Sequence, residues 1–222
     1  MKKVLSLVLT VSLLLALTAC KKEDAVNTSS QQIQNQQTEE EITPEKQENT
    51  EDSEIYKKTI DFTITLENGA VMKGELYPDV APKTVENFVD LCKKDFYDGL
   101  IFHRIIEGFM IQGGGYDKDL NPKEAQAIVG EFSSNGFENP LKHTRGVLSM
   151  ARTDDPNSAS SQFFIMHQDA PHLDGDYSAF GKITEGLEYI DEIATAKTTI
   201  DEKYGMKDFP KESIIIKSIT ID

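Results

Sequence analysis

The segment from Phe102 to Gly114, FHRIIEGFMIQGG, places one fixed cation and one amide among large apolar side chains. Arg104 supplies a guanidinium group that stays charged and offers its N–H donors in a rigid plane. Gln112 can donate and accept a hydrogen bond. A second segment, Ser158 to Met166 (SASSQFFIM), adds two adjacent phenylalanines. Such a site suits a neutral, apolar substrate whose reaction needs hydrogen bonds rather than a nucleophile.

Other reactive side chains give weaker indications. The four histidines show no short ligand spacing with cysteine or carboxylate residues, so the sequence predicts no metal site. The serines lack the Gly-x-Ser-x-Gly elbow of many hydrolases. His103 adjoins Arg104 and would point to the opposite side of a strand, so core packing or a backbone hydrogen bond is its expected role. We expect neither a metal nor a cofactor.

Short strands and two helices are expected to position these groups. Thr59–Leu66 and Ala70–Tyr77 flank an Asn-Gly turn signal, which predicts a β-hairpin. A helix should begin near Pro82, and a second should cover Leu187–Ala194, where the apolar residues fall on one face. Ser213–Ile221 has the pattern of a closing strand. Many short strands without βαβ alternation predict an antiparallel barrel or sandwich with capping helices.

Residues 1–19 have the layout of a secretory signal peptide: two lysines, an apolar run and small residues. The run is too short for a comfortable membrane-spanning helix, which needs about 20 residues. Leu17-Thr18-Ala19-Cys20 resembles the bacterial lipobox, which implies cleavage before Cys20 and lipid attachment to its sulfur. The alternative is an ordinary signal peptide that ends in cysteine. We favour the lipoprotein, outside the cytoplasm and anchored to the bacterial cell membrane.

The rest of the chain divides into a tether and one domain. Residues 20–55 carry the lipidated cysteine and a polar, acidic and Gln-rich segment that is expected to be disordered. Residues 56–222 form the globular domain. The formal charge of −15 argues against nucleic acid as a partner and against electrostatic adhesion to anionic lipid. Cys92 is the other cysteine, and its place on an apolar helix face predicts a core residue.

Four segments, FHRIIEGFMIQGG, GVLSMAR, NSASSQFFI and HLDGDYSAFGKI, resemble in order and spacing those of cyclophilins, the peptidyl-prolyl cis-trans isomerases. The resemblance covers essentially Thr59 to Asp222, and its specificity comes from the four segments together. It implies a mainly β fold, a closed eight-stranded antiparallel β-barrel capped by two α-helices, with its site on the outer face. The implied partners are proline-containing segments of exported proteins, and nothing in the sequence indicates an oligomer interface, so we expect a monomer.

By this resemblance Arg104 is the catalytic arginine, whereas a surface salt bridge is its alternative role. Arg152 stands where many cyclophilins have asparagine, and Tyr177 replaces a frequent histidine. His172 occupies the position of a tryptophan found in the relatives most sensitive to ciclosporin. Gln162 fits a groove position, but a structural amide is nearly as good an interpretation. The implied substrate-binding residues are Phe109, Met110, Gln112, Ala151, Arg152, Gln162, Phe164, His172, Leu173 and Tyr177.

Two other functions remain open at this point. The groove could hold proline-containing segments as a binding module with incidental turnover, or the acidic tether could serve adhesion or signalling. Intact Arg104 and Gln112 weigh against a pure binding module, since binding alone needs no donor for a transition state. The sequence therefore favours an isomerase that aids the folding of exported proteins.

Overall fold

The structure, a computed structural model, describes residues 57–222. The predicted signal peptide, the lipidated Cys20 and the predicted tether lie outside the described residues. Between residues 57 and 222, neither helix has the length and apolar character needed to cross a membrane.

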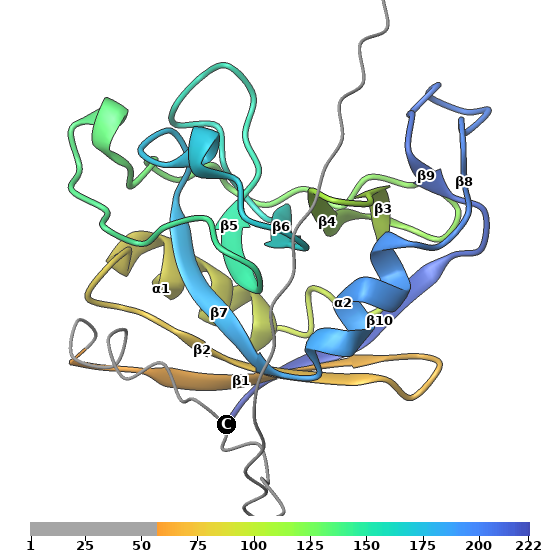
Figure 1. The fold of residues 1–222 in the computed structure, drawn as a ribbon, viewed down its shortest axis with the longest axis horizontal. Helices are drawn as coiled ribbons and strands as arrows, with labels where there is room; N and C mark the ends of the chain where they lie inside the picture. The colour runs from red at the N-terminus through yellow and green to blue at the C-terminus, as the bar shows by residue number, and fades with distance from the viewer. Residues whose placement is uncertain (1–56) are drawn as a thin grey trace, which may run out of the picture. The chain divides into compact units, whose positions relative to one another are not determined.

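Eight strands close into an antiparallel barrel, which confirms the predicted architecture (Figure 1). The hairpin expected from the Asn-Gly signal opens the domain, and the predicted C-terminal strand pairs with its first strand. The strands are β1 (Ile60–Leu66), β2 (Val71–Leu76), β3 (Leu100–Ile106), β4 (Met110–Asp117), β5 (Val147–Met150), β6 (Phe163–Met166), β7 (Ala179–Glu185) and β10 (Ile214–Ile221). Their order around the barrel is β1, β10, β3, β4, β6, β5, β7, β2.

Two helices and several short elements complete the domain. Helices α1 (Pro82–Cys92) and α2 (Leu187–Ala194) lie to either side of the barrel in Figure 1. Helix α2 has the predicted bounds. The short strands β8 (Thr198–Thr199) and β9 (Phe209–Pro210) pair with each other, and two 3-10 turns cover Ser133–Asn135 and Pro171–Leu173.

The first turn of α1 is satisfied by a distant carboxylate. Glu131 accepts hydrogen bonds from the backbone N–H groups of Lys83 (2.9 Å) and Thr84 (2.8 Å) and from the Thr84 hydroxyl. A proline at the start of a helix removes one N–H that would otherwise lack a partner, and the carboxylate satisfies two others. The negative charge at the helix N-terminus also interacts favourably with the helix dipole.

The strands under the candidate site are buried on both faces. In β6, Phe163 and Ile165 belong to the apolar cluster inside the barrel, whereas Phe164 and Met166 belong to a second cluster on its outer face. This alternation follows from the period of two in a β-strand. Met110, Phe164 and Leu173 of this second cluster line the candidate site.

Helix α1 closes one part of the core with a single aromatic side chain. The ring of Phe88 lies 5.2–6.1 Å from those of Phe62, Tyr97, Phe163 and Phe180. Cys92 is buried on the same helix, and burial raises the pKa of its thiol to about 12. Its burial confirms the predicted core role of Cys92, and a thiol with so high a pKa is a poor nucleophile near neutral pH.

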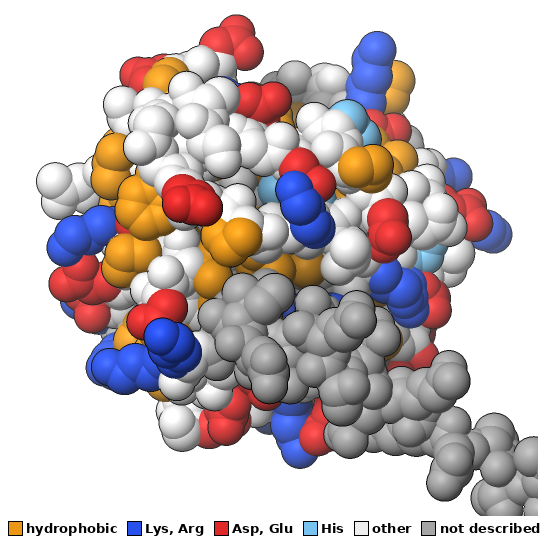
Figure 2. Space-filling model, turned by 60° about the vertical axis from the view of Figure 1, so that its left-hand side comes forward, with side chains coloured by type: hydrophobic (Ala, Val, Ile, Leu, Met, Phe, Trp, Pro, Cys, Tyr) orange, Lys and Arg blue, Asp and Glu red, His pale blue; other side chains and the backbone are white. Residues whose placement is uncertain are grey.

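Charged side chains of both signs share the surface of the domain. On the face in Figure 2, lysine, arginine, aspartate and glutamate side chains are interspersed, with apolar side chains in small groups between them. The described side chains visible on this face form no broad basic patch of the kind that binds phosphate backbones.

Candidate active site

A cavity of about 290 Å³ opens over the second apolar cluster, beside β3, β4 and β6. Nine of the eleven side chains that the sequence nominates line this cavity, and the other two, Gln162 and His172, lie next to it. The lining residues are Arg104, Phe109, Met110, Gln112, Ala151, Arg152, Phe164, Leu173 and Tyr177. We call this cavity the proline pocket, after the ring that the resemblance to cyclophilins leads us to expect in it.

Arg104 reaches the pocket from β3, directly across the strand pair from Gln112 on β4. Its Nε lies 3.8 Å from the Oδ2 atom of Asp208, so the arginine does take part in a surface ion pair. The side chain is 41 % exposed. Within residues 57–222 its terminal nitrogens donate no hydrogen bond. The ion pair occupies the Nε side, and the terminal N–H groups remain available to a ligand.

The apolar part of the pocket is held by ring contacts. The Phe164 and Tyr177 rings meet edge to face, with centroids 5.8 Å apart. The ring of His172 stacks on that of Phe109 at 5.7 Å, which places His172 on the rim. Aromatic walls and the adaptable thioether of Met110 can enclose a five-membered ring without requiring a hydrogen bond.

His143 supports this wall from below. Burial lowers the pKa of His143, so its ring is neutral at physiological pH. Its Nδ1 lies 3.0 Å from Asp174, and its Nε2 lies 3.0 Å from the Ser149 hydroxyl. A carboxylate can only accept, so Nδ1 carries the proton and Nε2 accepts from the serine. The ring stacks on Phe164, with centroids 6.1 Å apart, and fixes that side of the pocket.

Arg152 forms part of the rim with its whole side chain. Its guanidinium lies over the rings of Tyr177 (4.7 Å) and Phe132 (5.1 Å). It also donates hydrogen bonds to the backbone carbonyls of Asp176 (2.9 Å) and Thr153 (2.8 Å). Through the bond to Asp176, the Arg152 side chain joins two rim loops.

Gln162 affects the pocket through its contact with Gln112. The amide of Gln112 donates a 3.0 Å hydrogen bond to the Gln162 side-chain oxygen, and Gln162 is absent from the pocket lining. This arrangement favours the structural-amide interpretation, in which Gln162 fixes the orientation of Gln112. The two residues are 50 positions apart, so no local sequence signal relates them.

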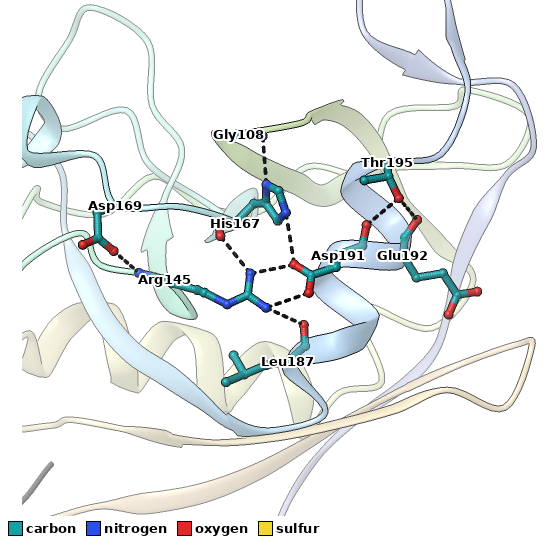
Figure 3. A network of polar contacts seen from close by, with 8 residues as sticks. All are labelled: Gly108, Arg145, His167, Asp169, Leu187, Asp191, Glu192 and Thr195. Carbon is teal, nitrogen blue, oxygen red and sulfur yellow. Dashed lines mark hydrogen bonds and ion pairs between the residues drawn. The ribbon is translucent and has the colours of Figure 1, made fainter. Parts of the chain in front are cut away.

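A polar network holds the turn that carries Phe109 (Figure 3). The backbone N–H of Gly108 donates a 2.8 Å hydrogen bond to His167 Nδ1. His167 Nε2 lies 3.1 Å from Asp191 on α2, and Arg145 binds the same carboxylate through both terminal nitrogens. No local sequence pattern gives His167 a role, because its partners lie far along the chain.

The residues described between 57 and 222 contain no group of three or more His, Cys, Asp or Glu side chains able to hold a metal ion. The pocket instead offers one guanidinium, one oriented amide and an apolar wall. That set can bind an apolar ring with its flanking peptide groups and stabilise charge that develops near the ring.

Comparisons with known proteins identify the family. A family model described as cyclophilin type peptidyl-prolyl cis-trans isomerase/CLD matches residues 59–221. The chain belongs to the cyclophilin family. Peptidyl-prolyl cis-trans isomerase B of Escherichia coli is 40 % identical over 154 residues, which cover 65 % of this chain and 90 % of that protein. The human peptidyl-prolyl cis-trans isomerase-like 3 is 42 % identical over 151 residues, 68 % and 89 % of the two chains.

Solved structures have a fold similar to that of this cyclophilin. A Cryptosporidium parvum cyclophilin-type isomerase, determined in the presence of the dipeptide Ala-Pro, aligns with a TM-score of 0.60 and 32 % identity. The alignment covers 73 % of this chain and 98 % of that one. This cyclophilin is accordingly a peptidyl-prolyl cis-trans isomerase that acts on proline-containing peptides.

Proposed function

We propose that this cyclophilin accelerates X–Pro bond rotation in exported proteins as they fold, held outside the cytoplasmic membrane by a lipid on Cys20. The lipobox-like sequence and the signal-peptide layout support the location. Uncatalysed X–Pro isomerisation takes tens to hundreds of seconds, slow enough to limit folding. The observation that carries the catalytic role is the placement of Arg104 at the edge of an apolar pocket.

The chemistry follows from the electronic structure of the amide. Resonance creates a barrier of about 18–20 kcal/mol to rotation about the C–N bond. In the twisted transition state the conjugation is lost, and the prolyl nitrogen gains lone-pair character. A donor that is already in place stabilises this charge only as it develops, which lowers the barrier. Arg104 is the donor, and no general base, nucleophile or metal is required.

The other residues of the pocket fix the substrate. Phe109, Met110, Phe164 and Leu173 would enclose the proline ring, so that rotation occurs in the chain on one side of it. Gln112, oriented by Gln162, would hold a flanking peptide group. Positioning of this kind converts binding energy into a lower barrier for rotation.

Exchange NMR on a short X–Pro peptide tests catalysis. The mature chain from residue 20, with Cys20→Ser to keep it free of lipid, should accelerate cis-trans exchange. Arg104→Ala should lower kcat/KM by at least about 100-fold, the scale of one lost transition-state donor, while peptide affinity changes far less. Arg104→Lys keeps the charge but loses the planar fork, so it should restore only part of the activity.

The same experiment separates the enzyme from a binding module. If Arg104→Ala leaves exchange unchanged while peptide still binds, the arginine is not the catalytic donor. If the unmodified sequence binds peptide without accelerating exchange, the fold serves for proline recognition only.

Cell fractionation tests the location. The full-length protein should be found with the membrane and should be released by detergent. Cys20→Ser should abolish lipid labelling. Lipid labelling that persists in the variant, or recovery of the wild-type protein from the cytoplasm, would refute the lipid anchor.

A further inference from the structure

A second hollow of about 400 Å³ adjoins the proline pocket and shares two of its side chains, Arg104 and Gln112. These two residues form the boundary between the hollows, so a peptide held by them would pass from one into the other. We call the second cavity the side hollow. Its lining residues are His103, Arg104, Gln112, Tyr116, Gln162, Met206, Lys207 and Asp208.

The outer wall of the side hollow is an ordered loop between β8 and β9. The Asp201 carboxylate accepts hydrogen bonds from the backbone N–H groups of Lys203, Tyr204 and Met206. The Lys203 ammonium donates to the backbone carbonyls of Asp119 and Leu120, each at 3.0 Å. The loop is therefore fixed against the segment that follows β4.

The end of this loop is fixed to the catalytic strand. The backbone carbonyl of Asp208 accepts a 2.9 Å hydrogen bond from the N–H of Ile105, the residue after Arg104. Asp208 itself has a left-handed backbone, with φ of 58°. A non-glycine residue adopts that conformation where its surroundings require it. The wall and the catalytic arginine thus belong to one hydrogen-bonded unit, and the hollow exists before a substrate binds.

The charges in the side hollow do not cancel. Arg104 and Asp208 pair with each other. Lys207 forms no ion pair or hydrogen bond through its ammonium with any other residue of the described range 57–222. Burial lowers the pKa of His103 to about 4, so this ring is neutral at physiological pH. The hollow therefore contains one uncompensated cation, in a chain whose formal charge is −15.

We propose that the side hollow is a substrate subsite for a carboxylate side chain, aspartate or glutamate, from a peptide residue close to the isomerising proline. Lys207 binds the carboxylate, and the Arg104–Asp208 pair keeps the catalytic guanidinium from being captured by it. The proposal rests on the proposed isomerase function and adds a substrate class to it. It makes Lys207 a specificity-determining residue rather than a catalytic one.

The test compares matched peptides that carry glutamate, glutamine or lysine at one of four positions, the two residues before proline and the two residues after it. For the mature Cys20→Ser chain, glutamate should be preferred over glutamine at one of these positions by about two- to fivefold in kcat/KM, the range of a solvent-exposed ion pair. The preference should weaken as salt is raised. Lys207→Met should abolish it, and Lys207→Glu should reverse it in favour of lysine.

Lys217→Glu is the matched control, since it changes the net charge equally from an exposed position on β10 that lines neither hollow. It should leave the glutamate-to-glutamine ratio as in the parent protein. If Lys207→Glu and Lys217→Glu change the glutamate-to-glutamine ratio equally, the preference arises from the net charge of the protein, and the proposal is overturned. A ratio of one at all four positions would also overturn it, while leaving the isomerase intact. Absence of turnover on every peptide would instead refute the proposed function.

Discussion

The surface ion pair of Arg104, which the sequence presented as the alternative to a catalytic role, leaves its terminal nitrogens available for the catalytic role proposed above. Arg104 pairs with Asp208 through Nε, and it presents its terminal nitrogens at the edge of the proline pocket. A half-exposed guanidinium acts in a medium of higher dielectric than a buried one, so its electrostatic effect on a bound amide depends on the substrate excluding water. The proposed catalytic role of Arg104 therefore requires that the apolar wall enclose the proline well.

Arg152 should contribute to binding rather than to turnover. Arg152→Ala removes the contact over Tyr177, the hydrogen bond to the Asp176 carbonyl on the opposite rim loop, and the hydrogen bond to the adjacent Thr153 carbonyl. We expect KM to rise about two- to fivefold with little change in kcat, as for a cation–π contact at a partly exposed site. Arg152→Lys keeps the charge but lacks the planar donors, so its KM should be intermediate. A loss of kcat as large as that of Arg104→Ala would show a direct role in the transition state instead.

His103 makes the stability of the domain depend on pH. Burial lowers the pKa of this histidine from 6.5 to about 4. Between these two values the unfolded chain binds a proton that the folded protein does not, so the free energy of unfolding falls as pH decreases. The loss should amount to at most about 1.4 kcal/mol per pH unit for this group. His143, whose pKa burial also lowers, acts in the same direction.

Urea denaturation at pH values from 7 to 4.5 checks this prediction. His103→Gln should show a shallower decline in unfolding free energy than the parent protein over that range. The carboxylates titrate alike in both proteins, so the comparison isolates the histidine. Parallel declines would mean that His103 takes up its proton in the folded state as readily as in the unfolded chain.

At the scale of elements, local sequence patterns predicted the elements that nearby residues determine. The period of Leu187–Ala194 and the Asn-Gly signal after β1 identified a helix and a hairpin correctly. The strands β8 and β9 were not predicted, because two residues are too few to show a period. The carboxylate of Glu131 at the start of α1 could not be foreseen either, since it comes from 47 residues away.

In the site, too, local motifs predicted some features, whereas contacts between distant residues determine the others. The residue types of the pocket were predicted from the family motifs, and the structure brings nine of them together. The supports are contacts over long sequence separations: Gln162 with Gln112, His143 with Asp174, and His167 with Gly108. Such pairs arise from the barrel topology, which places distant segments side by side.

His167 should act as a positioning residue for the turn that carries Phe109. His167→Asn can keep an acceptor near the Nδ1 position for the Gly108 N–H. His167→Gln moves the amide towards the Nε2 position, so that Gly108 loses its acceptor while the contact with Asp191 persists. We expect His167→Gln to raise the KM for a proline peptide by about two- to fivefold, the effect of about one lost hydrogen bond. His167→Asn should stay close to the parent value.

Two measurements distinguish positioning from general destabilisation. The two variants should have similar unfolding temperatures, whereas their KM values should differ. The amide resonance of Gly108 in NMR spectra should shift in His167→Gln and remain near its original position in His167→Asn. If KM simply follows the unfolding temperature, His167 has a structural role only.

At the scale of the whole molecule, β2 and β7 are neighbouring strands of the closed barrel, and glycines allow their close approach. A Cβ atom at Gly181 would lie 2.6 Å from the carbonyl oxygen of Glu75 and 3.0 Å from Leu76. At Gly74 it would collide with the carbonyl oxygen of Lys182 and lie 2.7 Å from the Phe62 ring. The close approach of β2 and β7 thus requires residues without a Cβ atom at Gly74 and Gly181.

Gly74→Ala should destabilise the barrel by about 1–3 kcal/mol, the usual cost of adding a methyl group to a filled interior. Gly69→Ala, in the turn of the same hairpin, is the matched control. Its Cβ would meet nothing within 4 Å, so only the cost of a φ of +90° applies, roughly 1 kcal/mol or somewhat more. Denaturant unfolding of the two variants measures the difference. Since Gly74 lines neither hollow, kcat/KM of the folded Gly74→Ala protein should remain near the parent value. If Gly74→Ala loses no more unfolding free energy than Gly69→Ala, β2 and β7 can separate enough to admit the methyl group. The barrel would then be less rigid between these two strands than the contacts indicate.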